Sequence, residues 1–577
     1  MSDTATDTGP LRKERDGRIL VLTVVNPPVN ALSYPVRTGL IEAIDQACKD
    51  PHIDAMILRC EGRSFISGAD IKEFSNPRDP RVPELVEFVE RSTKPIVAAL
   101  HGTALGGGLE ISMACHYRVA RPDVTMGLPE VNIGLLPGAG GTQRLPRLIG
   151  IPRALDVIVG GATLDAGEAL ACGLIDQVSV GDLRADAIAF ARRLVEEGRG
   201  PRRTSERQVA PVDPALFERL RELARRRQPG YLAPLNCIAA VEASALPFEQ
   251  GLQREKKLFF ELFGSDQAKA MQYAFFAQRE VGRLPAGAPG LASRHGIVLV
   301  GEGAEADRLA AVLGAKAGML TRLSAQALKA RPLSEAHALQ IASAAWVIDA
   351  CPDASTDRGA LLEAVVDAGA RNVSTIALKD LPQLASRWGS RATLSGVRAS
   401  PLSASKLVET FPGPGGPAAL QPLHEALRAA GATPMVLENQ AEPLQPRLLE
   451  PAKVLLDRIG DSGTARSAIS GALQAYGMQP GVFGFDMPDA EVGSSEDGQA
   501  VIDALIGVIA DHALTLVATG GLGAVQIDAA WTLGLSFPAY RAGPCRMIDT
   551  VGCQVIAASA QAAARRLGVP LPLPSLA

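Results

Sequence analysis

The chain has 577 residues, of which 47% are hydrophobic and 21% are charged, and this balance excludes a mainly disordered protein. Its 58 basic and 62 acidic residues leave a net charge of −4. The chain therefore lacks the overall basic excess that would indicate nucleic-acid binding. Eight cysteines without a Cys-x-x-Cys pair exclude a disulfide scaffold and argue against a structural zinc site. A chain of this length is expected to form about three or four domains.

The first residues carry no apolar segment of the kind that signal peptides have. Residues 1–16 are polar, so we expect them to be flexible. No uncharged apolar run reaches about 18 residues, and we expect no membrane span. The last residues, Pro-Leu-Pro-Ser-Leu-Ala, differ from an SKL-type address. The prediction is a cytoplasmic protein.

Strand and helix patterns alternate from residue 17 to about residue 190. Segments 18–27 and 54–62 are short, apolar and rich in β-branched residues, which predicts buried strands. Apolar residues at helical spacing predict a helix over 33–50, and segments 94–102 and 115–123 predict two more strands. This alternation is typical of an α/β unit.

The remaining chain is predicted to hold a helical region, a linker, a second α/β unit and a helical tail. Residues 190–285 have amphipathic helical patterns, with a long stretch at 248–280 that is interrupted near Gly264. Segment 283–296 is rich in Gly, Pro, Ala and Ser, which indicates a linker. A strand, a glycine turn and a helix follow at 296–315.

Three consecutive glycines precede a predicted helix at Gly106–Gly108, and Glu110 lies at its start. Glycine allows close approach of the backbone, and a helix N-terminus offers free N–H groups and a partial positive charge. Such a loop can stabilise a developing oxyanion. The alternative is an ordinary tight turn between a strand and a helix.

A second acidic residue, Glu130, follows Pro129 in another glycine-rich segment. A lone glutamate at either position is usually a surface residue or a helix cap. Two carboxylates beside glycine-rich loops can instead divide the acid and base roles of a reaction if their environments separate their pKa values.

Three motifs together resemble the crotonase (enoyl-CoA hydratase/isomerase) superfamily. They are Ser-Gly-Ala-Asp-Ile-Lys-Glu-Phe at 67–74, Ala-Leu-Gly-Gly-Gly-Leu-Glu at 104–110, and the segment 127–145, which begins Gly-Leu-Pro-Glu-Val-Asn-Ile-Gly. The resemblance implies that the backbone N–H groups of Ala69 and Gly107 hold the thioester oxygen. It implies acid–base roles for Glu110 and Glu130.

The same resemblance implies further contacts to an acyl-CoA thioester. These involve Gly68, Asp70, Ile71 and Gly106. Many superfamily members with other chemistries lack one of the two glutamates, so keeping both favours water addition to a trans-2-enoyl-CoA. The reaction needs no metal and no redox cofactor, and coenzyme A enters only as part of the substrate.

Three alternatives stay open for this site. The two glutamates can also move a double bond from position 3 to position 2 of an enoyl-CoA. The fold can serve another crotonase-type acyl-CoA reaction, or the chain can be a non-catalytic acyl-CoA binder.

The order of segments along the whole chain is similar to multifunctional enzyme type 1, a family that joins an enoyl-CoA hydratase to a 3-hydroxyacyl-CoA dehydrogenase. The expected fold is multidomain α/β, with a ClpP/crotonase-like spiral fold, a linker helix, a Rossmann-like domain and a C-terminal helical domain. The expected bounds are 1–16 for the flexible N-terminus, 17–245 for the crotonase domain, 246–290 for the linker helix, 291–435 for the Rossmann-like domain and 436–577 for the helical domain. We expect a monomer, as in this family.

The second α/β unit keeps part of a nucleotide-binding pattern. Gly301, Gly303 and Ala306 fit Gly-x-Gly-x-x-Ala, which is weak evidence for dinucleotide binding when it stands alone.

The departures from the family fall where the dehydrogenase chemistry belongs. Val397 stands at the position of the catalytic histidine, while Glu409 matches that histidine's glutamate partner. Arg322 replaces the acidic residue for the ribose, and Pro446 replaces an asparagine. A valine cannot accept the hydroxyl proton, so we expect an inactive dehydrogenase half. The arginine at 322 removes the ribose acceptor and argues against NAD, while a 2′-phosphate at Arg322 or residual nucleotide binding through the glycine turn is the alternative. An active bifunctional hydratase and dehydrogenase is the alternative.

Overall fold

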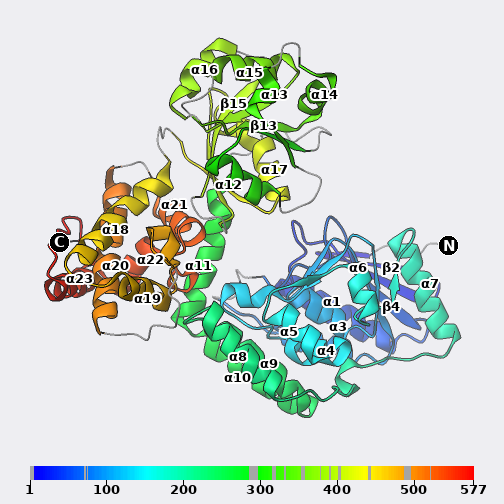
Figure 1. The fold of residues 1–577 in the computed structure, drawn as a ribbon. Helices are drawn as coiled ribbons and strands as arrows, with labels where there is room; N and C mark the ends of the chain where they lie inside the picture. Colours follow the sequence, from blue (N-terminus) through cyan, green and yellow to red (C-terminus); the bar gives the residue numbers. More distant parts are fainter. Residues whose placement is uncertain are drawn as a thin grey trace. The chain divides into compact units, whose positions relative to one another are not determined.

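The protein forms two compact units, residues 1–269 and 270–577, and each is described by itself (Figure 1). The structure is a computed structural model. It describes residues 6–70, 73, 76–284, 296–314, 320–329, 333–352, 358–376, 378–388, 391–400, 405–438, 443–486, 496–519 and 522–576. The predicted linker at 283–296 lies almost entirely outside these residues. Both units combine β-sheets with helices, so the multidomain α/β prediction is confirmed.

The first unit is built on a seven-stranded sheet with the order β1-β2-β3-β4-β5-β7-β10. The strands are β1 (Thr6–Thr8), β2 (Leu11–Asp16), β3 (Ile19–Val24), β4 (Ala55–Cys60), β5 (Ile96–Leu100), β7 (Tyr117–Ala120) and β10 (Gln177–Val178). β3, β4, β5, β7 and β10 run parallel. The four predicted strands of this unit are therefore confirmed as β3, β4, β5 and β7.

The N-terminal segment differs from the expected flexible chain. β2 pairs antiparallel with β3 over its full length, and β1 pairs with β2. Only Leu11 of β2 is buried. Because the ladder uses backbone groups, β2 can be held between β1 and β3 while its side chains stay charged.

A smaller sheet carries the loops that lead into the site. It has the order β6-β8-β9, with β6 (Thr103–Leu105), β8 (Thr125–Gly127) and β9 (Thr163–Leu164). β6 runs directly towards helix α3 (Gly107–Ala114), and β8 is followed by the short 3-10 helix η2 (Pro129–Ile133). The glycine motif and Glu130 therefore follow two adjacent parallel strands.

The other helices of this unit surround the sheets. They are α1 (Tyr34–Lys49), α2 (Val82–Glu90), α4 (Gly141–Ile149), α5 (Ile151–Ile158), α6 (Ala166–Ala171), α7 (Leu183–Glu196), α8 (Ala215–Arg227), α9 (Ala233–Glu242) and α10 (Phe248–Phe263), with the 3-10 turns η3 (Thr204–Glu206) and η4 (Ala243–Ala245). The helix predicted over 33–50 is confirmed as α1.

Helix α10, expected as part of a linker, belongs to the first unit. It lies beside α9, which packs on α8 (Figure 1). Its buried residues are Gly251, Glu255, Leu258 and Leu262, at the spacing of one helix face. Leu258 and Leu262 join the apolar core of the first unit. The next helix, α11 (Asp266–Val281), runs across the boundary at residue 269.

The second unit contains a seven-stranded sheet with the order β12-β11-β13-β14-β15-β16-β17. The strands are β11 (Ile297–Val300), β12 (Leu320–Leu323), β13 (Trp346–Asp349), β14 (Asn372–Thr375), β15 (Thr393–Ala399), β16 (Leu407–Phe411) and β17 (Thr433–Val436). Only the β15–β16 pair is antiparallel among the described strands of this sheet. The chain reverses its direction of travel across the sheet at β11, as in doubly wound nucleotide-binding folds.

Helices accompany this sheet and then form the tail. Beside the sheet are α12 (Ala304–Leu313), α13 (Ala325–Lys329), α14 (Glu335–Ser343), α15 (Arg358–Asp367), α16 (Leu381–Trp388) and α17 (Gln421–Ala429), with η5 (Leu378–Asp380) and η6 (Pro417–Leu420). The tail contains α18 (Leu444–Asp461), α19 (Arg466–Tyr476), η7 (Pro480–Phe483), α20 (Glu496–Thr519), α21 (Ala524–Ala529), the π-helix η8 (Ala530–Gly534), η9 (Ala539–Arg541), α22 (Pro544–Val551) and α23 (Cys553–Leu567). One continuous apolar cluster includes residues of both the sheet and the tail.

Helix α20 is long and apolar enough to cross a membrane by length and composition alone. More than half of its apolar stretch is buried in the structure, and α20 packs against α18, α19, α22 and α23. A core helix of a helical lobe has the same properties.

Candidate active site

The glycine loop brings two backbone amides together. A Cβ atom built on Gly107 would lie 3.4 Å from the amide nitrogen of Ala69, so the two backbones are in close contact. Gly107 is the first residue of α3, and its N–H has no acceptor within the helix. For the N–H of Ala69, the described residues provide no hydrogen-bond acceptor. Both predicted oxyanion donors are thus adjacent and available.

Glu110 is placed by the first turn of α3 and by a second turn at the start of α4. Its side chain is only 3% exposed. Its Oε1 accepts hydrogen bonds from the N–H groups of Ala139 (2.7 Å) and Gly141 (2.9 Å). Burial raises the pKa of Glu110, whereas these two N–H donors and the Arg144 guanidinium act to lower it.

Glu130 reaches the same loop from η2. A Cβ atom on Gly106 would lie 3.0 Å from its Oε1, and Gly106 accepts the N–H of Glu110 at 3.0 Å. Glu130 is half-buried, yet its Oε2 is buried and has no hydrogen-bond partner in the described part of the chain. Desolvation raises the pKa of Glu130 well above its usual range, and charge on Glu110 raises it further. The structure therefore brings the two predicted glutamates to one end of α3.

A third buried carboxyl group, on Glu255 of α10, was missing from the sequence prediction. Its Oε1 accepts the N–H of Gly140 at 2.7 Å, and its Oε2 accepts the N–H (3.0 Å) and the hydroxyl (2.5 Å) of Thr142. Burial, followed by charge on Glu110, raises the pKa of Glu255 to about 8. One sequence signal was available, because Glu255 occupies the apolar face of an amphipathic helix.

The other predicted substrate contacts lie in the same two loops. Gly106 has a φ of 54° and donates its N–H to the carbonyl of Gly127. Gly68 has a φ of 111°, and its carbonyl accepts the N–H of Leu32. Asp70 is half-buried directly after Ala69, whereas Ile71 lies outside the described residues. The positive φ values explain the two glycines, because other residues rarely adopt them.

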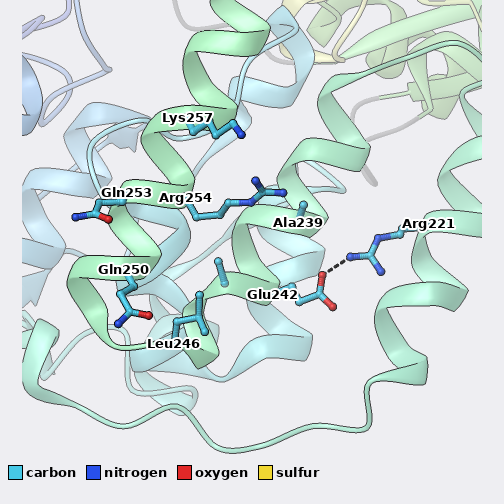
Figure 2. Close-up of a pocket in the computed structure, with 9 residues that line it drawn as sticks. Arg221, Ala239, Glu242, Leu246, Gln250, Gln253, Arg254 and Lys257 are labelled. Atoms are coloured by element: carbon cyan, nitrogen blue, oxygen red, sulfur yellow. Dashed lines mark hydrogen bonds and ion pairs between the residues drawn. The ribbon is translucent and has the colours of Figure 1, made fainter.

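A cavity of about 610 Å³ lies on the other face of α10. Figure 2 shows Gln250, Gln253, Arg254 and Lys257 along the helix, opposite the ion pair between Arg221 and Glu242. Glu110, Glu130 and Glu255 do not line this cavity. We place the candidate active site at the glutamates because the hydrogen-bond geometry and the perturbed carboxyl groups meet there.

The predicted nucleotide turn of the second unit forms after β11. Gly301 has a φ of 125°, and a Cβ atom on it would lie 2.8 Å from the carbonyl carbon of Ala350. Gly303 precedes α12, and Ala306 is buried. Arg322 donates to the carbonyl of Gly301 at 3.2 Å and to Oδ1 of Asp307 at 2.7 Å. Arg322 therefore lies beside the turn, and its guanidinium is held there by the protein's own acceptors.

The structure does not bring Val397 and Glu409 together. In the β15–β16 ladder Val397 pairs with Thr410 and Arg398 pairs with Glu409, so the two side chains point to opposite faces of the sheet. Val397 is buried in an apolar cluster.

The carboxylate of Glu409 has another task, at the start of α18. It accepts the N–H groups of Leu444 (3.0 Å) and Gln445 (2.9 Å), and Pro446 follows in the same first turn. A proline is tolerated there because its missing N–H would have no partner inside the helix.

Comparison with known proteins shows which family the first unit resembles. Residues 14–224 match the family described as enoyl-CoA hydratase/isomerase. A peroxisomal bifunctional enzyme of Danio rerio is 45% identical over 276 residues, and that of Homo sapiens is 41% identical over 277 residues. Each match covers 47% of this chain and 38% of the relative. The chain thus spans less than half the length of these bifunctional relatives.

A shorter relative is covered almost completely. A probable enoyl-CoA hydratase of Bacillus subtilis is 37% identical over 274 residues, which are 46% of this chain and 95% of the relative. A crystal structure of an enoyl-CoA hydratase from Bacillus anthracis is 27% identical, with 46% of this chain and 96% of that chain covered and a TM-score of 0.31. Through the family match and the near-complete coverage of the Bacillus subtilis relative, the chain belongs to the enoyl-CoA hydratase/isomerase family.

Proposed function

We propose that the first unit adds water across the double bond of a trans-2-enoyl-CoA thioester. The observation that carries this proposal is the meeting of Glu110 and Glu130 at the N-terminal end of α3, beside the amides of Ala69 and Gly107. The family to which the chain belongs, and the enoyl-CoA hydratase name of the Bacillus subtilis relative, support the same reaction.

The backbone amides would stabilise the negative charge that develops on the thioester oxygen. As the oxygen of water bonds to C3, electrons of the double bond move towards this carbonyl oxygen. Two N–H donors aimed at that oxygen lower the barrier, and the loss of one such donor typically costs about 10²–10³ in rate. No redox cofactor takes part in this addition.

The two glutamates differ in pKa, which divides their roles. Glu110 accepts two N–H hydrogen bonds and lies near Arg144, which favour its ionised form, so it is the group that takes the proton of the attacking water. Glu130 has the more strongly raised pKa and carries the proton that is delivered to C2. Solvent exchange then returns the proton to Glu130 and removes it from Glu110.

The test is the loss of enoyl-thioester absorbance when the purified chain meets crotonyl-CoA. Glu110→Gln and Glu130→Gln are each expected to lower kcat by about 10²–10⁴, the usual contribution of a general acid or base. Glu196→Gln is the control, because this glutamate is exposed at the end of α7. A wild-type chain that binds the thioester without turnover would leave a non-catalytic binder as the better account.

Isomerisation of a 3-enoyl-CoA at the same glutamates would need proton removal at C2 and delivery at C4. A 3-enoyl-CoA substrate in the same assay format separates this activity from hydration, because its conversion creates enoyl absorbance instead of removing it.

We further propose that the second unit does not oxidise the hydroxyacyl product. The N-terminal turn of α12, where a dinucleotide pyrophosphate would bind, carries Glu305 and Asp307, and Glu302 lies just before it. Glu305 is paired with Arg308 and Asp307 with Arg322, so these arginines are already held by the protein's own carboxylates, and the exposed Glu302 adds negative charge that opposes an anionic ligand. These residues do not fit NAD. The monomeric state and the cytoplasmic location stay predictions.

A further inference from the structure

The turn from Gly138 to Thr142 holds two carboxyl groups at once. Its N–H groups alternate between them: Ala139 and Gly141 donate to Glu110, while Gly140 and Thr142 donate to Glu255. Gly140 has a φ of 89°, a conformation that turns successive amides to different sides. The position of Glu110 is therefore tied to that of Glu255.

Helix α10 follows this turn along four successive contacts. Phe248 lies beneath the Arg144 guanidinium, with 5.1 Å between the guanidinium carbon and the ring centroid. Gly251 approaches Gln143 so closely that a Cβ atom would lie 2.0 Å from its Oε1. Phe259 touches Gly138, where a Cβ atom would lie 2.6 Å from the ring. Glu255 adds hydrogen bonds to this close packing between α10 and the turn.

We propose that Glu255 is a positioning residue for hydration, so that α10 completes the active site. This inference rests on the proposed function of Glu110 and Glu130. Glu255 does not touch the reacting atoms. It accepts hydrogen bonds from the amides of Gly140 and Thr142. The alternating amides of Ala139 and Gly141 hold the carboxylate of Glu110, which takes the proton from water.

The charge of Glu255 also acts on the acid of the pair. Glu110 on α3, Glu130 on η2 and Arg144 on α4 are the ionisable groups around it, and Arg144 is paired with Glu90 of α2 at 2.6 Å. Above about pH 8, where Glu255 itself ionises, its negative charge adds to desolvation and to the charge on Glu110 in raising the pKa of Glu130. Removal of that charge lowers this pKa, so Glu130 would lose its proton at lower pH.

The experiment compares Glu255→Gln with Glu261→Gln in the full chain, with crotonyl-CoA as substrate. Glu261 is an exposed glutamate of the same helix. A glutamine amide cannot accept N–H bonds at both ends, so the turn must shift, and a misplacement of about 1 Å can cost about 10²-fold in rate. We expect kcat to fall by roughly 10–10²-fold with KM nearly unchanged, and the falling alkaline limb of the kcat/KM profile to move to lower pH.

A purely structural role of Glu255 would lower the amount of folded protein without moving the alkaline limb. If Glu255→Gln does not fold, Thr142→Val removes one hydroxyl donor to Glu255 and leaves all amides in place, and it is expected to lower kcat while Thr142→Ser restores it. Wild-type kcat and pH profile in Glu255→Gln, or in Thr142→Val as the substitute, would overturn the inference and leave the proposed function standing. A wild-type chain without hydration would overturn both.

Discussion

Single residues in this site are constrained by the space around glycines more than by charge. Gly106, Gly107 and Gly141 each lie where a side chain would meet a group of the site: Oε1 of Glu130, the amide of Ala69 and Oε1 of Glu110, respectively. Two of the three motifs that indicate the family, 104–110 and 127–145, thus contain glycines at positions of close approach. Their glycines allow backbone amides and carboxyl groups to share a small volume.

Gly141→Ala tests this constraint. The new methyl group would lie 2.7 Å from Cβ of Pro137 and 2.8 Å from Oε1 of Glu110, so Glu110 must move or lose its hydrogen bond from this amide. We expect a loss of stability of about 1–3 kcal/mol from overpacking, measured by urea unfolding, together with a loss of hydration of about 10²-fold. Gly200→Ala is the matched control because its surroundings are open. A wild-type rate in Gly141→Ala would contradict the placement of Glu110.

At the scale of elements, one device recurs in both units: a buried carboxyl group from elsewhere in the chain caps a helix N-terminus. Glu255 does this at α4, Glu409 at α18 and Asp528 at α22, where it accepts the N–H groups of Cys545 (2.7 Å) and Arg546 (3.0 Å). The free N–H groups and the partial positive charge of a helix start favour an acceptor at this place. In this chain the cap also ties distant elements together.

The cap at α4 has a predictable dependence on pH. The pKa of Glu255 is raised from its usual 4.5 to about 8, so between these pH values the folded chain holds a proton that the unfolded chain releases. The stability contributed by this proton is fully present below pH 4.5 and is lost as the pH rises through about 8. Within this window we expect the urea midpoint of the first unit to fall with rising pH.

Glu255→Gln should flatten this dependence by up to about 1.4 kcal/mol per pH unit, the value for one proton. Some slope is expected to remain, because the pKa values of Glu110 and Glu130 are raised as well. Glu261→Gln should retain the full slope. A wild-type midpoint that rises between pH 4.5 and 8 would contradict the direction of the Glu255 shift.

Patterns in the sequence predict elements whose side chains carry the information. The buried strand β3 and the amphipathic helix α1 are of this kind, since apolar periodicity follows burial. β2 escapes prediction because its backbone, not its charged side chains, holds it in the sheet. The cap by Glu255 escapes prediction for a different reason. Glu255 lies 115 positions from Gly140 and 113 positions from Thr142 along the chain, and no local sequence pattern spans that separation.

At the scale of the whole molecule, the second unit keeps a nucleotide-type sheet but arranges its polar residues for stability. Glu409 caps α18, Val397 faces an apolar cluster, and Arg322 is held at the glycine turn. A different apolar cluster joins this sheet to the helical tail. A fold can be kept without the catalytic activity that other members of the fold have, because packing depends on apolar surface, whereas catalysis depends on a few polar groups in one geometry.

The chain is therefore expected to accumulate a 3-hydroxyacyl-CoA. With crotonyl-CoA and NAD present, we expect hydration without formation of NADH, which is followed by its absorbance. Val397→His should not restore oxidation, because position 397 and Glu409 face opposite sides of the sheet and an imidazole at 397 would be buried among apolar side chains without its partner. Addition of a separate NAD-dependent hydroxyacyl-CoA dehydrogenase is the control: NADH must then appear, since the product itself is competent. Formation of NADH by the wild-type chain alone, at a rate near that of hydration, would show instead that the second unit binds NAD and supplies a base from another residue.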